Sequence, residues 1–107
     1  VYPRPQQKQL PIWIAIGGTP ESIARAATLN IPLALAIIGG NPNQFVPHIK
    51  YYRDIRTQAG FTTPAQVSIN SHAYIADTSQ KAADEFYPAY AAVMSRIGAE
   101  RGWPPME

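Results

Sequence analysis

Residues 9–27, QLPIWIAIGGTPESIARAA, change from a strand pattern to a helix pattern within a few positions. Residues 11–16 are apolar without alternation, which is typical of a parallel strand covered on both faces. Gly17 and Gly18 end this strand, and Thr19 then suits the N-cap of a helix whose first residue is proline. The expected apolar side of this helix consists of Ile23, Ala24, Ala26, Ala27 and Leu29.

The same pattern returns in the next stretch of the chain. Residues 32–38, PLALAII, are a second continuous apolar strand, and Gly39 and Gly40 end it. Asn41 suits the N-cap of a helix over about 42–59, which also begins with a proline. The apolar residues of this helix recur at steps of three and four; they are Phe45, Ile49, Tyr52 and Ile55.

A third unit follows with a different kind of strand. Residues 67–76 alternate in polarity, which predicts a strand with one apolar and one polar face. Thr78 is one of three adjacent candidate caps for a helix over 79–101, in which Pro88 predicts a kink or a new helix start. The polar face of the strand consists of Ser68, Asn70, His72 and Tyr74.

Three strand-helix units in succession predict an α/β fold with parallel strands. A ten-residue helix is about 15 Å long and a six-residue strand about 20 Å, so each helix returns the chain to the start of its strand. The expected organisation is one segment: an entering loop at 1–10, then units at 11–30, 31–60 and 66–101. Right-handed crossovers allow part of a doubly wound sheet or part of an eight-stranded barrel, and the spacing does not choose between them.

The two glycine pairs are the best candidates for a binding site. In parallel α/β folds, ligands bind beyond the carboxyl ends of the strands, where a helix start offers backbone amides and partial positive charge to an anion. Glycine allows that backbone to approach a phosphate closely. Gly17, Gly18 and Thr19 could therefore hold one phosphate together with Gly39 and Gly40. The alternative is that both pairs only make tight turns, because no GxGxxG or lysine-bearing phosphate loop is present.

The remaining polar residues are weaker candidates. His72 could contact a ligand or carry a proton, but a lone histidine on a strand is more often a structural donor. His48 is expected on the surface or between helices. The sequence contains no carboxylate pair, metal-ligand spacing or set of nucleophile and base, so catalytic residues stay unassigned and no metal is expected. Of the arginines on the expected helices, Arg25 is the candidate for contacting a phosphate. The arginines expected to be solvated on helices are Arg25, Arg53, Arg56 and Arg96.

The composition excludes several classes of protein. The chain has 107 residues and a net charge of +2, too small and scattered to favour nucleic acid or an acidic membrane. It has no cysteine, which excludes disulfides and fits a reducing, cytoplasmic compartment. The longest apolar run, residues 31–38, is far shorter than the about 20 residues of a membrane helix.

Four stretches between about residues 10 and 105 carry a family resemblance. They read PIWIAIGGTPESIARAA at 11–27, PLALAIIGGNPNQFVPHIKYYRDI at 32–55, HAYIADTSQKAADEFYPAY at 72–90 and RIGAERGWPP at 96–105. Together they resemble the C-terminal part of a bacterial luciferase-like monooxygenase. Each stretch is common alone, and the combination is specific.

The resemblance implies a TIM barrel that uses reduced flavin mononucleotide, or in some branches a deazaflavin, to oxidise or reduce small molecules. In this family the flavin phosphate lies at the carboxyl ends of the late strands. That position carries over onto Gly17, Gly18 and Thr19 and onto Gly39 and Gly40, which agrees with the reading of the turns.

The length implies that this chain is a fragment of such a barrel and is inactive alone. Val1 is not an initiator methionine, and the family's substrate-side residues lie largely on earlier strands. Unpaired sheet edges predict a homo-oligomer. Two alternatives stay open: a small flavodoxin-like module that binds a phosphoryl ligand, and a non-catalytic scaffold subunit.

Overall fold

The computed structural model describes residues 2–104 of the chain. It divides into two compact units, Val1–His72 and Ala73–Glu107. The first unit holds the sheet, and the second holds one long helix. No helix among the described residues is both long and apolar enough to cross a membrane.

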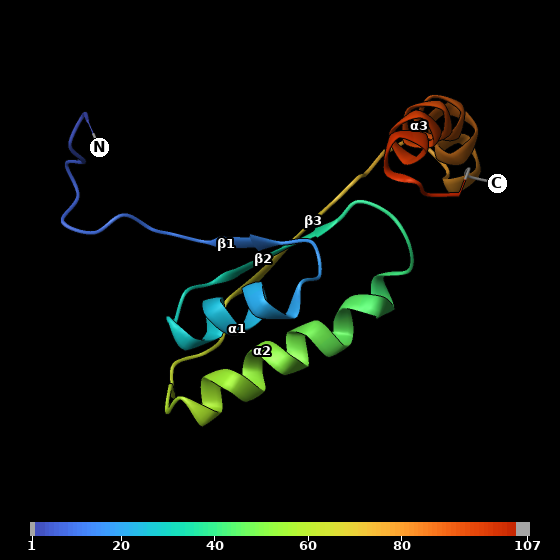
Figure 1. Cartoon of the computed structure of the whole chain (residues 1–107). Helices are drawn as coiled ribbons and strands as arrows, with labels where there is room; N and C mark the ends of the chain where they lie inside the picture. Colours follow the sequence, from blue (N-terminus) through green and yellow to red (C-terminus); the bar gives the residue numbers. More distant parts are fainter. Residues whose placement is uncertain (1, 105–107) are drawn as a thin grey trace. The chain divides into compact units, whose positions relative to one another are not determined.

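The first unit is a three-stranded parallel α/β layer. The strands lie in the order β1-β2-β3, and both pairings are parallel, as the sequence predicts. Its elements, seen in Figure 1, are β1 (Ile14–Ile16), α1 (Pro20–Thr28), β2 (Leu33–Ile37), the 3-10 turn η1 (Pro42–Phe45), α2 (Val46–Gln58) and β3 (Val67–Ser71).

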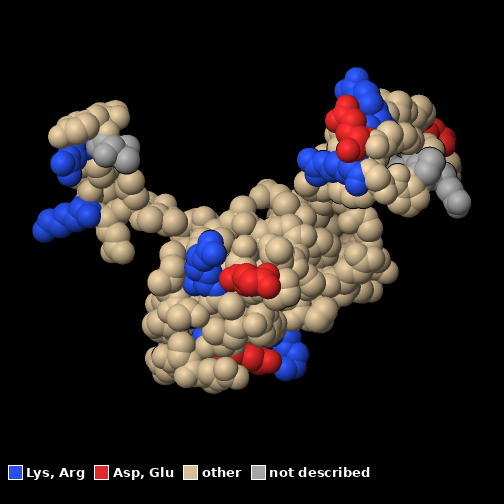
Figure 2. Space-filling model, viewed as in Figure 1, with Lys and Arg blue, Asp and Glu red and all other residues tan. Residues whose placement is uncertain are grey.

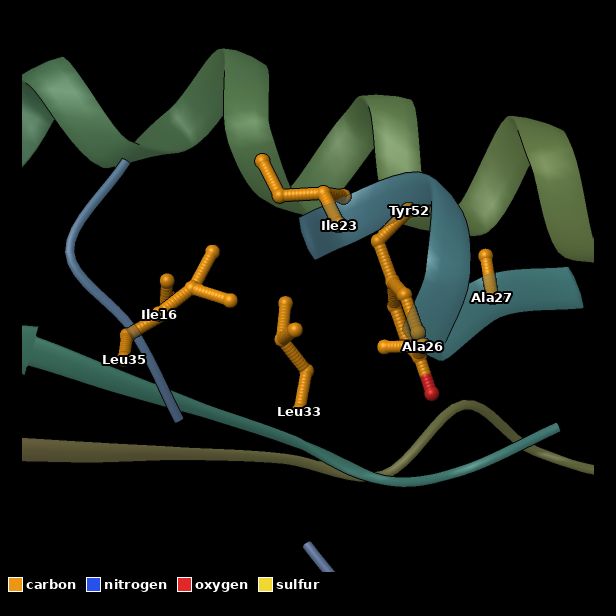
Figure 3. Packing of buried hydrophobic residues seen from close by; sticks show 7 residues of the cluster. All are labelled: Ile16, Ile23, Ala26, Ala27, Leu33, Leu35 and Tyr52. Carbon is orange, nitrogen blue, oxygen red and sulfur yellow. The ribbon is translucent and has the colours of Figure 1, made fainter. Parts of the chain in front are cut away.

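The hydrophobic core lies between the sheet and the two helices. Figure 3 shows Leu33 and Leu35 pointing from β2 toward Ile23 of α1 and Tyr52 of α2, and all four are essentially inaccessible to solvent. Burial of a large apolar side chain stabilises a fold by about 1.5–3 kcal/mol. The Tyr52 hydroxyl does not remain unpaired, because it donates to the carbonyl of Ile31 at 2.8 Å.

The helices of the first unit cover only one face of its sheet (Figure 1). The expectation that residues 11–16 are covered on both faces is therefore wrong within this unit, and Ala15 is exposed. Successive crossovers of one hand place their helices on the same side, which explains the one-sided cover. The opposite face carries small or polar side chains, namely Ala15, Ala34, Ala36, Ser68 and Asn70.

Residues in the left-handed region end both helices of the first unit. Asn30 follows α1 with φ +57°, and Gly60 follows α2 with φ +86°; asparagine and glycine are the residue types that adopt this region most readily. Leu29 was expected to extend the apolar side of α1, but it is 58% exposed. It lies just beyond the last helical residue, where the chain has begun to turn away from the core.

Arg56 is buried, so the expectation that it is solvated is wrong. Its side chain is only 4% exposed. One terminal nitrogen donates to Asn30 Oδ1, and the other donates to the carbonyl and hydroxyl oxygens of Thr63 at 2.8 and 3.0 Å. The guanidinium also faces the rings of Tyr52 and Phe61 at 5.7 and 5.6 Å. Arg56 thus joins the turn after α1 to the connection between α2 and β3.

The third strand ends at Ser71, five residues before the expected end at residue 76. Its neighbour β2 ends at Ile37, which is paired with Ser71, so the chain beyond has no strand on β2 to pair with. His72 therefore follows the strand and does not belong to it.

The second unit consists chiefly of α3 (Ser79–Arg101). The Thr78 hydroxyl oxygen caps it by accepting a hydrogen bond from the Lys81 amide at 3.2 Å. The helix is continuous through Pro88, so no new helix begins there. Gly102, with φ +71°, ends it.

An aromatic stack ties the segment before α3 to that helix. The Tyr74 ring lies 5.4 Å from the Phe86 ring, which lies 5.0 Å from the Tyr90 ring. The Tyr74 hydroxyl donates to Glu85 at 2.9 Å. This hydrogen bond, together with the negative charge of Glu85, raises the pKa of Tyr74 above its usual value.

Candidate functional site

Both glycine loops leave the same edge of the sheet. Ile16 at the end of β1 is paired with Leu35, and β2 continues two residues further in the same direction. The loop of Gly17 and Gly18 and the loop of Gly39 and Gly40 are therefore neighbours at the carboxyl edge, because parallel strands end on one side.

The first loop requires glycine at its second position. Gly18 has φ +124°, which L side chains rarely adopt. A Cβ on Gly18 would also lie 3.2 Å from Nε2 of His48, a tight approach. A Cβ on Gly17 would meet nothing within 4 Å, so open space lies beside that residue.

The second loop repeats this arrangement. Gly40 has φ +78°, and a Cβ there would lie 3.2 Å from Oε1 of Gln44. A Cβ on Gly39 would again meet nothing within 4 Å. In each pair the first glycine faces open space and the second supports the turn.

The start of α1 offers backbone amides that have no partner. Thr19 occupies the N-cap position, as predicted, but its side chain makes no capping hydrogen bond; its hydroxyl lies 3.5 Å from that of Ser22. Among residues 2–104, the amides of Glu21 and Ser22 have no protein acceptor. Unpaired amides at the positive end of a helix dipole are what an anion binds.

The second helix start is less open to an anion. The Asn41 side chain caps it by accepting a hydrogen bond from the Asn43 amide at 2.9 Å, which confirms Asn41 as the cap. The predicted α-helix over 42–59 begins instead with the 3-10 turn η1, so no long helix dipole ends at this loop. In the described chain, the amides of Gly40 and Asn41 have no internal acceptor. The start of α1 therefore leaves more of its helix dipole open to solvent than the second loop does.

Few charged side chains lie at this edge. Glu21 is exposed in the first turn of α1, where its charge favours the helix but opposes a bound anion. Arg25 lies in the last turn of α1, toward the opposite edge, which removes the structural basis for its reaching a phosphate. On the side of the molecule seen in Figure 2, basic and acidic side chains are few and mixed. The described residues contain no group of His, Asp or Glu side chains that could hold a metal ion.

A hollow of about 290 Å³ lies at the carboxyl edge beside β2 and β3. His72 lines it, so the one histidine proposed for function from the strand pattern does lie near this edge. A larger hollow of about 650 Å³ lies at the amino ends of the strands, far from the helix starts, and parallel folds bind ligands at the other edge. The hollow beside β2 and β3 is lined by Ala36, Ile37, Ile38, Asn70, Ser71 and His72.

Sequence reasoning missed His48 at this edge. The residue lies in the first turn of α2, and its imidazole faces the Gly18 loop. The position between helices was anticipated, but the contact with a glycine loop 30 positions earlier was not visible in any local pattern.

The chain matches a known protein family. A family model described as luciferase-like monooxygenase matches residues 1–105. A search of curated proteins found no match to the chain.

Proposed function

Because the chain belongs to the luciferase-like monooxygenase family, a family of oxidoreductases, we propose that it carries the flavin phosphate site of a flavin-dependent enzyme. The observation that supports this most directly is the pair of glycine loops at one edge of a parallel sheet. Their amides have no protein partners in the described chain, and Gly17 and Gly39 leave space beside the backbone.

The first loop would hold most of the phosphate. The amides of Thr19, Glu21 and Ser22 would donate to its oxygens, with the α1 dipole favouring its charge. Gly40 and Asn41 would add donors from the second loop. The flavin, when bound, supplies the redox chemistry, and these residues supply its orientation at the sheet edge.

The uncovered face of the sheet is consistent with the inner wall of a barrel. Ala34 and Ala36 are small, and Ser68 and Asn70 are polar, whereas the opposite face packs under α1 and α2. Interior-facing and helix-facing residues alternate in this way along barrel strands. We therefore place the three strands in a TIM barrel wall and expect no turnover from these strands alone, since one wall does not enclose a substrate.

The cofactor proposed is flavin mononucleotide, with a deazaflavin as the alternative. Both present a phosphate to the loops. The substrate is proposed to be a small molecule.

Comparison of flavin mononucleotide with riboflavin tests this function. The two ligands share the ring and differ by the phosphate, so quenching of flavin fluorescence on titration with the chain should give at least about tenfold tighter binding of the mononucleotide, the equivalent of about 1.4 kcal/mol. Inorganic phosphate should compete. Equal affinity for the two flavins would contradict the proposal.

A further inference from the structure

His48 contacts the first glycine loop from the helix that follows the second loop. It follows the second loop in the chain, in the first turn of α2, yet its Nε2 points at the first loop, 3.2 Å from where a Cβ of Gly18 would stand. A Cβ at position 18 would crowd the imidazole there. The half-buried ring therefore lies beside Gly18, one residue before the Thr19 N-cap of α1.

The ring is held in place from one side by an aromatic neighbour. The Phe45 and His48 ring centroids are 5.8 Å apart with an interplanar angle of 51°. Phe45 itself packs against the core of the first unit. Within residues 2–104, neither imidazole nitrogen has a protein hydrogen-bond partner, so the ring is positioned by packing while its nitrogens stay available.

We propose that His48 is a side-chain ligand of the phosphate at the glycine loops, donating from Nε2. This inference rests on the proposed function and adds to it a residue outside the loops themselves. Backbone amides alone bind any small anion, whereas an added imidazole donor strengthens the binding of a phosphate monoester. His48 would also make the site depend on the packing of α2 against the first loop.

Two substitutions separate donation from packing. His48→Phe keeps an aromatic ring beside Phe45 but has no donor, and His48→Gln keeps an N–H donor without the ring. We expect His48→Phe to weaken binding of flavin mononucleotide about tenfold, and His48→Gln to recover most of that loss. Binding of riboflavin should change by less than about twofold in either variant.

Lys50→Gln is the matched control for charge and helix position. Lys50 is an exposed cation two residues away on α2 and pairs with Asp54. Its loss should change mononucleotide affinity by less than about twofold, because surface charges are screened. Circular dichroism of each variant establishes that it is folded.

The outcomes distinguish the two proposals. If the native chain prefers the mononucleotide over riboflavin but His48→Phe binds it equally well, His48 is only a packing residue and this inference is wrong. If the native chain shows no preference, the phosphate site itself is wrong. If His48→Gln binds as weakly as His48→Phe, a donor at this position does not restore binding, which also overturns the inference.

Discussion

Replacing Gly18 by alanine should destabilise the first unit by about 2 kcal/mol, whereas the same change at Gly17 should not. A non-glycine residue in a sparsely populated region of positive φ costs about 1–3 kcal/mol, and Gly18 has φ +124°. The new Cβ would also stand 3.2 Å from His48 Nε2, and moving that ring off its rotamer costs about 1 kcal/mol. Alanine restricts the unfolded chain, which offsets about 0.7 kcal/mol of this loss.

Urea denaturation followed by circular dichroism measures the difference. With a slope of about 1 kcal/mol per molar urea for a small domain, the midpoint of Gly18→Ala should fall by about 2 M. Gly17→Ala is the control, because its Cβ meets nothing within 4 Å, and its midpoint should lie within about 0.5 M of the native value.

The second loop provides an independent repeat of this comparison. Gly40→Ala should also destabilise, since Gly40 has φ +78° and its Cβ would meet Gln44 Oε1 at 3.2 Å. Gly39→Ala should be tolerated. If Gly18→Ala and Gly17→Ala unfold at the same urea concentration, the conformation assigned to the first loop is refuted, and the loop does not present the amides described above.

Three further outcomes are expected. Arg56→Met should lower the free energy of unfolding by about 3 kcal/mol in urea denaturation, because it leaves Asn30 and Thr63 oxygens without their donor; a loss under about 1 kcal/mol would contradict this. Glu85→Gln should lower the pKa of Tyr74, seen as earlier tyrosinate absorbance on raising the pH. Because the folded pKa is raised, the stabilising contribution of this pair is present below about pH 10 and is lost as the pH rises through the folded value; an unchanged titration would count against the hydrogen bond. Sedimentation of the isolated chain should show self-association, because β1 and β3 each have one neighbour in the described sheet, and a sharp monomer boundary at high concentration would disprove it.

Features set by local sequence could be predicted. The continuous apolar runs ending at Gly17 and Gly39 indicate parallel strands, and both strands are found there. Asn41 acts as the cap expected from its residue type. These properties depend on neighbours within a few positions, which is the range over which periodicity and capping operate.

Features that depend on residues far apart in the chain could not be predicted from the sequence. Arg56 lies on a helix whose local pattern gives no reason for burial; its partner Asn30 lies 26 residues earlier. The contact of His48 with Gly18 likewise depends on how α2 packs beside α1. Thr19 is a different case. It occupies the N-cap position as predicted, but its side chain makes no capping hydrogen bond. The amides that such a bond would satisfy therefore remain unpaired, which the residue type alone did not indicate.

Chemical-shift mapping of backbone amides on addition of flavin mononucleotide tests the central claim most directly. We predict that the shifts concentrate at Gly18, Thr19, Glu21 and Gly40, that inorganic phosphate reproduces them, and that riboflavin causes none at those amides. Shifts clustered instead at the amino edge of the sheet, around Asn30, or none at either glycine loop, would contradict it.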